Sequence, residues 1–203
     1  MIAVIDYGLG NLTSILSMFR RIGAPAVITN NSSEIEAADK LIVPGVGHFK
    51  KGMENLKNSG LQSLLQELVV VQKKPVLGIC LGAQLMTQHS EEGDVEGLGW
   101  IGARTIRFQQ EQLGKLKVPH MGWADVTFQN QSPLWNNVPP EPRFYHVHSY
   151  HFSVTDPSVI SATSWYGYEF VCAFQQNNIF GVQFHPEKSH KYGMKVLENF
   201  AAL

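Results

Sequence analysis

The segment that most constrains the fold of this chain is Gly78-Ile79-Cys80-Leu81-Gly82. The short apolar run before it predicts a buried strand, and the residues from Ala83 to Gln88 predict the start of a helix. Glycines on both sides of Cys80 permit a sharp strand-to-helix turn, which would push the thiol out over the sheet as in a nucleophile elbow. The positive end of the following helix would favour the thiolate. Free cysteines are also common core residues, so the elbow alone leaves both interpretations open.

A second group of reactive residue types lies far downstream, where His185 and Glu187 follow an apolar run. Residues two apart in an extended segment point to the same side, so we expect Glu187 to hold one nitrogen of the His185 imidazole. The other nitrogen would then be free to take the proton of the Cys80 thiol. Each residue alone could be a solvated loop side chain, but together the three predict a catalytic triad of nucleophile, base and orienting acid.

The composition sets broad limits on the class of protein. A chain of 203 residues with 44% hydrophobic content predicts one domain, 1–203, with a sizeable core. A net charge of −1 argues against nucleic acid as a partner. No run reaches the roughly 18 apolar residues of a membrane helix, and the first residues predict a strand and not a signal peptide. We therefore expect a cytoplasmic protein. The chain has two cysteines, Cys80 and Cys172, which predict no disulfide framework and no zinc site.

The order of the predicted elements indicates an α/β fold. The first half alternates strands and helices, and its apolar strands predict a parallel sheet covered on both faces. The second half is rich in strands separated by turn signals, which predicts antiparallel strands added to that sheet. The predicted strands are 2–6, 26–29, 41–43, 100–108, 123–128, 143–150, 159–164, 169–175 and 179–184. The predicted helices are 11–22, 49–58, 61–71, 83–88 and 191–200.

With these residues assembled, the chain resembles the class I glutamine amidotransferases of the triad type. Within that family it is most similar to the glutaminase subunits of imidazole glycerol phosphate synthase. The resemblance implies a flavodoxin-like three-layer sandwich and hydrolysis of glutamine to glutamate and ammonia without a cofactor. It also implies a heterodimer in which a (β/α)8-barrel subunit uses the ammonia in histidine biosynthesis. The segments that carry it span the chain: Asp6–Asn11, Pro44–Gly47, Gly78–Gln84, Ser90–Gly93, Pro119–Trp123, Tyr145–Tyr150 and Phe180–Ser189.

The resemblance also implies roles for individual residues. Cys80 would attack the side-chain amide, His185 would move the proton and Glu187 would orient His185. The tetrahedral intermediate needs donors for its oxyanion, and these would be backbone amides of Leu81, Val46 and Gly47. The residues implied to hold glutamine are Gly45, Gln84, Glu92, Ser149 and Tyr150. The residues implied to face the synthase partner are Asn11, Trp123, Tyr145 and Lys188; aromatic residues such as these are more commonly part of a core.

The chain departs from the family pattern near the expected ammonia exit. Ala124 follows Trp123 where most members carry Asn, and His146 stands where Phe is usual; Ala83 replaces a common Met. His146 and His148 share a strand face, with His151 nearby, which could suggest a metal site. No carboxylate or cysteine accompanies them at a ligand spacing, so we expect none.

Three other functions stay open at this level. A paralogous group of glutaminases, which supplies ammonia to a sugar amidotransferase in surface-polysaccharide pathways, shares several segments with this chain. A stand-alone thiol γ-glutamyl hydrolase on the same fold is the second, and a non-catalytic binding subunit is the third. The segments shared with the paralogous group are 98–101, 151, 167–170 and 188–191.

Overall fold

Strands and helices alternate through the first half of the computed structural model, which describes residues 1–203. Five parallel strands form one end of a thirteen-stranded sheet, in the order β2-β1-β3-β4-β13. Their bounds are β2 (Ala26–Thr29), β1 (Ile2–Ile5), β3 (Lys40–Val43), β4 (Val76–Ile79) and β13 (Ile179–Val182). Ile79 pairs with Val182 across β4 and β13, so the two chain segments that follow these strands leave the sheet at the same edge.

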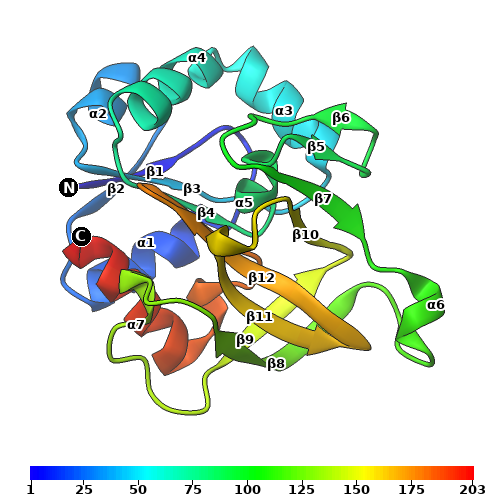
Figure 1. Cartoon of the computed structure of the whole chain (residues 1–203). Coiled ribbons are helices and arrows are strands. Elements are labelled where there is room, and N and C mark those ends of the chain that lie inside the picture. The colour runs from blue at the N-terminus through cyan, green and yellow to red at the C-terminus, as the bar shows by residue number, and fades with distance from the viewer.

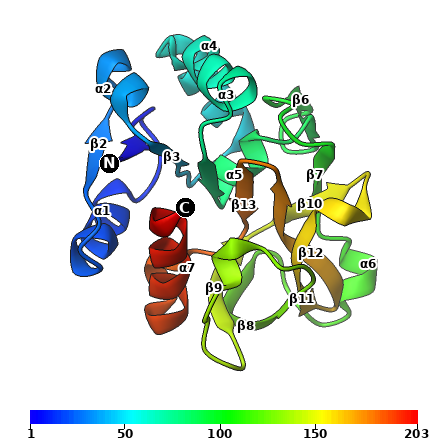
Figure 2. The same cartoon turned by 60° about the vertical axis from the view of Figure 1, so that its left-hand side comes forward.

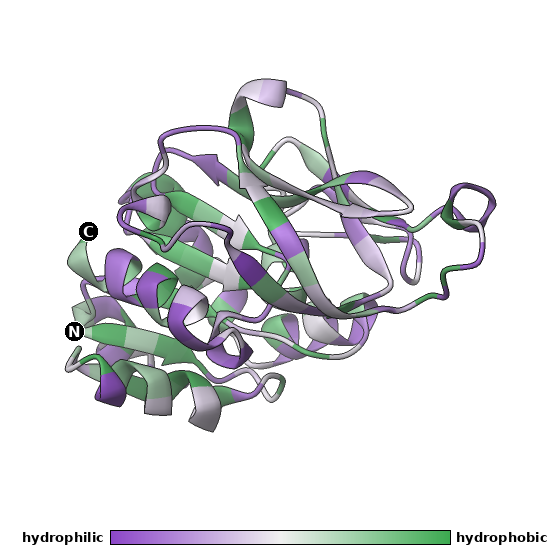
Figure 3. Ribbon diagram, turned by 90° about the horizontal axis from the view of Figure 1, so that it is seen from below, coloured by the Kyte–Doolittle hydropathy of each residue, from purple (hydrophilic) through white to green (hydrophobic).

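Helices cover both faces of the parallel strands, which confirms the expected three-layer sandwich (Figures 1 and 2). Successive strand residues point to opposite faces, so β1 contributes Ile2 and Val4 to one apolar core and Ala3 and Ile5 to another. Helices α1 (Leu12–Arg21) and α7 (His190–Ala202) bury the first core. The second is buried by α2 (Ser32–Ala37), α3 (Phe49–Asn58), α4 (Leu61–Gln66) and α5 (Leu81–Leu85). Figure 3 shows that the central strands are largely hydrophobic, whereas the surrounding helices carry both kinds of residue.

The second half of the chain extends the sheet with mostly antiparallel strands, as expected. From β13 the sheet continues through β12 (Tyr168–Gln176), β10 (Tyr150–Val154), β7 (Ala103–Arg107), β5 (His89–Ser90) and β6 (Val95–Glu96). A branch from β12 runs through β11 (Ile160–Tyr166), β8 (His120–Phe128) and β9 (Arg143–His148). The Tyr145 carbonyl in β9 accepts a hydrogen bond from the His185 amide at 2.9 Å, so this branch folds back over the segment after β13.

Several element boundaries differ from the sequence prediction. The predicted strand 143–150 is broken at Ser149, whose carbonyl accepts a hydrogen bond from the Phe108 amide, and the chain continues as β10. The helix predicted over 61–71 changes after Gln66 into a wider π-helical turn, Glu67–Val71. Helix α5 begins at Leu81, two residues before the predicted start, and ends at Leu85. The prediction also missed α2, β5, β6 and the short helix α6 (Gln110–Leu113). The remaining one-turn 3₁₀ segments are Pro133–Trp135, Pro157–Val159 and Pro186–Lys188.

None of the helices combines the length and the apolar character that crossing a bilayer requires.

Candidate functional site

The turn around Cys80 has the geometry that the glycine spacing predicted. Cys80 sits between β4 and α5 with φ 52° and ψ −113°, a region that non-glycine residues rarely adopt, at a cost of about 1–3 kcal/mol. A Cβ on Gly78 would lie 2.5 Å from the Ala83 Cα, and one on Gly82 would lie 1.8 Å from the Val43 carbonyl oxygen. Both contacts are too short for any side chain. The two glycines therefore let α5 pack directly against the sheet, and the turn presents the Cys80 side chain above it.

His185 and Glu187 are in contact beside this turn. Nδ1 of His185 lies 2.7 Å from Oε1 of Glu187, and the two side chains are 1% and 2% exposed. The route to this contact differs from the prediction of an extended segment, because Pro186–Lys188 forms a 3₁₀ turn that brings Glu187 back toward the imidazole. The carboxylate therefore fixes one nitrogen of His185 and leaves Nε2 free of any other intramolecular partner.

The Cys80 thiol is the neighbour of His185 on its other side. Burial disfavours the charged imidazolium, but hydrogen bonding and charge interactions with Cys80 and Glu187 outweigh burial and raise the pKa of His185 to about 10. Nε2 of His185 nevertheless makes no hydrogen bond of normal geometry, so the imidazole and the thiol must come into hydrogen-bond geometry before a proton can pass between them. The structure thus brings the three predicted triad residues together with the imidazole in the middle.

Gln183 is a site residue that the sequence prediction missed. Its side chain is fully buried, and its Nε2 donates to the Cys80 sulfur at 3.6 Å. Its Oε1 accepts from Gln84 Nε2 at 3.1 Å, so the amide links the sulfur to α5. Gln183 precedes His185 by two positions, and this alternation along a strand was the available signal.

Backbone amides next to the thiol are available as donors. Leu81 is the first residue of α5, so its N–H has no partner within the helix. The amides of Val46 and Gly47 donate no backbone hydrogen bond. Gly47 has φ 118°, which glycine adopts without strain. These are the three amides that the resemblance implies for an oxyanion.

A pocket of about 270 Å³ opens above Cys80. This is just below the range of about 300–1,000 Å³ that is common for ligand pockets, and it suits a molecule the size of an amino acid. It is lined by Val46, Gly47, Cys80, Leu81, Gln84, Glu92, Pro119, Val147, His148, Ser149 and Tyr150. Four of the five residues that the resemblance implies for glutamine binding are in this lining.

The fifth, Gly45, lies behind the pocket wall. A Cβ at this position would lie 2.6 Å from the hydroxyl oxygen of Tyr7 and 2.9 Å from the Leu81 Cβ. The Tyr7 hydroxyl itself donates to the Pro44 carbonyl at 2.5 Å. Gly45 therefore allows the 44–47 loop to approach α5 closely and supports the pocket from outside.

Glu92 is the only acidic residue in the pocket lining. Its Oε2 accepts a hydrogen bond of 2.7 Å from the Phe49 amide at the start of α3. Gln84 is also held by the chain, since its Nε2 donates to the Tyr150 carbonyl at 3.4 Å. Both side chains are thus fixed by the chain before any ligand binds.

Three of the four residues implied to face a partner form one surface group, which we call the aromatic patch: Trp123, Tyr145 and Lys188. The Trp123 and Tyr145 rings meet edge to face at 6.2 Å, and Lys188 Nζ lies 5.7 Å from the centre of the Tyr145 ring. Trp123 is 38% exposed and stacks on His190, a residue that the prediction did not include. Asn11 precedes α1, which packs against the 186–188 turn. The patch lies on the outer face of the β8–β9 pair, next to the triad.

The chain matches the family described as "Glutamine amidotransferase class-I" over residues 3–203. It is 48% identical to "Imidazole glycerol phosphate synthase subunit HisH 2" of Pseudomonas aeruginosa over the full length of both chains. It is 52% identical to the protein of the same description from Methanococcus maripaludis, over 98% of each chain. Among solved structures, one described as "Crystal structure of glutamine amidotransferase" covers all of both chains with a TM-score of 0.77 at 15% identity. A putative GMP synthase protein from Thermoplasma acidophilum aligns over 99% of this chain and 92% of that one, with a TM-score of 0.72 at 22% identity. At these identities the structural likeness concerns the fold.

Proposed function

This chain belongs to the class-I glutamine amidotransferase family, as a glutaminase subunit of the imidazole glycerol phosphate synthase type, and we propose that Cys80, His185 and Glu187 carry its reaction. The observation that carries the proposal is the meeting of these three side chains at the edge where β4 and β13 end. A strained turn presents the sulfur, a buried carboxylate holds the imidazole, and a pocket of amino-acid size opens above them.

The proposed reaction begins with attack of the Cys80 thiolate on the side-chain carbonyl of glutamine. The raised pKa of His185 keeps its imidazole protonated near neutral pH, so it is ready to give a proton to the departing ammonia. The remaining γ-glutamyl thioester is then hydrolysed by water, with neutral His185 taking a proton from the water. The sum is glutamine plus water giving glutamate plus ammonia. In both steps the amides of Leu81, Val46 and Gly47 would stabilise the oxyanion.

The same pocket supplies groups for the amino-acid end of glutamine. Glu92 is its only negative side chain, so we assign it to the α-ammonium group. Gln84, Ser149 and Tyr150 supply polar groups around the rest of the substrate. This assignment predicts that amides without an α-amino group are poor substrates.

We further propose that the aromatic patch, with Asn11, binds a (β/α)8-barrel synthase subunit in a heterodimer. Support comes from its exposed aromatic and cationic character and its position beside the triad. A closed contact there would deliver ammonia before it is protonated and lost. A working thiol needs a reducing compartment, so we place the complex in the cytoplasm.

The experiment that tests the function is complementation of a histidine auxotroph that lacks only its glutaminase subunit, together with the assay of the purified pair. Growth, and formation of imidazole glycerol phosphate from glutamine in the presence of the barrel subunit, is the expected result. Glutamine hydrolysis at the same rate with and without any barrel protein would instead indicate a stand-alone γ-glutamyl hydrolase.

A glutaminase for a sugar amidotransferase is a second candidate, and one contact favours it. His151 and Tyr168, which lie in two of the segments shared with that paralogous group, meet through a hydrogen bond of 2.8 Å. Phe108 packs on both rings at centroid distances of 4.8 and 5.9 Å. Failure to complement the auxotroph, combined with an active partner-dependent glutaminase, would support this pathway over histidine biosynthesis.

A further inference from the structure

Three histidine rings meet on the inner face of the β8–β9 pair, directly behind the glutamine pocket. His120 pairs with His148 across the two strands, and His146 pairs with Gly122. The His146 ring stacks on His120 at a centroid distance of 4.7 Å. One ring nitrogen from each histidine lies within 4.8 Å of the other two.

The hydrogen bonds of this cluster leave ring nitrogens without partners. Nδ1–H of His148 donates to the Tyr150 carbonyl at 2.7 Å, so its Nε2 is an acceptor and takes a hydrogen bond from Nδ1–H of His146 at 3.0 Å. Nε2 of His146 and Nδ1 of His120 are buried and have no hydrogen-bond partner at all. Buried polar atoms without partners are uncommon in folded proteins and call for an explanation.

All three histidines are buried, and burial disfavours the charged imidazolium. Neutral imidazole is the form of histidine that binds transition metals.

We propose that His120, His146 and His148 bind one transition-metal ion, with Zn²⁺ the best match. Imidazole nitrogens suit zinc, and three histidines with an open fourth position are an established zinc ligand set. Bonds of about 2.0–2.1 Å in a tetrahedral site require ligand nitrogens about 3.3 Å apart, close to the 3.0 Å between His146 Nδ1 and His148 Nε2. The ion would replace the hydrogen bond between these two atoms, and the proton of His146 would move from Nδ1 to Nε2. The His120 ring must turn out of its stack on His146 to complete the set. The bond from His148 to the Tyr150 carbonyl is the outer-shell contact that metal-bound histidines usually make.

The expectation of no metal site considered His146, His148 and His151 and rested on the lack of a carboxylate or cysteine at a ligand spacing. The third ligand comes from β8, and only the register of β8 against β9 places it there. Access is available from two sides, since His148 lines the glutamine pocket and His120 lines a second pocket of about 340 Å³ beside Trp123 and Trp165. An ion at this place would tie β8 to β9 behind the substrate site.

The test is titration of the full chain with Zn²⁺ by calorimetry and by competition with a chromophoric chelator. All proteins carry Cys80→Ser, which removes the pocket thiol as a competing ligand. His146→Phe removes one ligand and restores an aromatic ring, so it should keep the fold, which circular dichroism would verify. His89→Ala is the matched control, because His89 and Asp94 form the most plausible adventitious surface site, 2.9 Å apart.

We expect one Zn²⁺ per chain, at least about tenfold weaker binding after His146→Phe, and unchanged binding after His89→Ala. X-ray absorption should show imidazole nitrogens as the main ligands, and Zn²⁺ should raise the melting temperature only where His146 is present. Absence of stoichiometric binding, equal binding by the His146→Phe variant, or loss of binding in the His89→Ala control would each overturn the proposal.

Discussion

Nδ1 of His185 and Oε1 of Glu187 lie 2.7 Å apart in a contact that is almost fully removed from solvent. A buried charge without its partner is strongly destabilising, so each member of this pair depends on the other. The same contact determines which imidazole nitrogen faces Cys80. Stability and catalysis therefore depend on a single hydrogen bond at the end of β13.

The first prediction concerns the pH dependence of stability. Burial opposes the charge on His185, but Cys80 and Glu187 outweigh it, so its folded-state pKa of about 10 lies above the roughly 6.5 of an unfolded chain. A raised pKa stabilises the folded protein fully below about pH 6.5, and this contribution is lost as the pH rises toward 10. The free energy of unfolding from urea titrations should fall over this range in the wild type, and less steeply in Glu187→Gln. Equal slopes in the two proteins would refute this role of the carboxylate.

The second prediction concerns Gln183, whose amide donates to the Cys80 sulfur and accepts from Gln84. Gln183→Leu keeps the size of the side chain but removes both hydrogen bonds, and a hydrogen bond to a charged group is worth about 1.5–3 kcal/mol. Glutaminase kcat in the presence of the barrel subunit should fall about 10- to 100-fold, and iodoacetamide should label Cys80 more slowly.

Gln175→Leu is the control for this change, because Gln175 lies on the neighbouring strand β12 and makes no hydrogen bond to the thiol. It should leave both rates close to those of the wild type. If Gln183→Leu labelled at the wild-type rate and lost activity only through a higher KM, Gln183 would act on the substrate and not on the sulfur.

The third prediction concerns the elbow. Gly82→Ala would place a methyl group 1.8 Å from the Val43 carbonyl oxygen, so α5 must move away from the sheet. We expect a loss of about 1–3 kcal/mol or more in the free energy of unfolding. Gly102→Ala is the control, since a Cβ there meets nothing within 4 Å, and its effect should stay within about 0.5 kcal/mol. A Gly82→Ala protein as stable as this control would show that the close approach is not required.

Most of the parallel half of the fold could be predicted from the sequence, because short apolar runs between turn residues specify buried strands. Helix α2 was missed although a signal was present: the Asn31 side chain accepts from the Ser33 and Glu34 amides and caps the helix. The start of α5 was placed too late because Leu81 was assigned to the turn. The break at Ser149 depends on a contact with Phe108, which no local pattern reveals.

The residues of the candidate site also fall into those that the sequence reveals and those that it does not. Cys80, His185 and Glu187 could be proposed because each lies in a short motif whose residue types have few other uses together. Gln183 could have been found from its spacing to His185. His120 could not be joined to His146 and His148, because their meeting depends on the register between β8 and β9, which the connecting residues 129–142 do not reveal.

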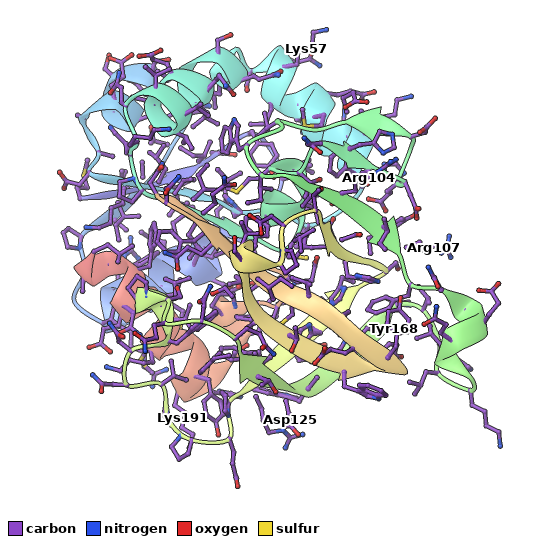
Figure 4. The ribbon with its side chains drawn as sticks, in the orientation of Figure 1. Lys57, Arg104, Arg107, Asp125, Tyr168 and Lys191 are labelled. Carbon is purple, nitrogen blue, oxygen red and sulfur yellow. The ribbon has the colours of Figure 1, made fainter.

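The fourth prediction concerns the partner surface. Lys188→Glu reverses the charge above the Tyr145 ring and should weaken binding of the barrel subunit at least about tenfold in a calorimetric titration. Lys57→Glu is the matched control, because Lys57 lies on α3, far from the aromatic patch. Figure 4 shows Lys57 at the opposite end of the molecule from Lys191, which follows Lys188 closely in the chain. Equal affinity of the two variants would remove the aromatic patch from the interface.

The most direct test of the whole account is the rate of glutamate formation by Cys80→Ala beside Cys172→Ala, each with the barrel subunit. Cys172 is fully buried in β12, and burial raises the pKa of its thiol, so it cannot serve as the nucleophile at neutral pH. We predict that Cys80→Ala loses at least about 10³-fold in rate while Cys172→Ala stays near the wild type. A Cys80→Ala protein that forms glutamate at the wild-type rate would contradict the account.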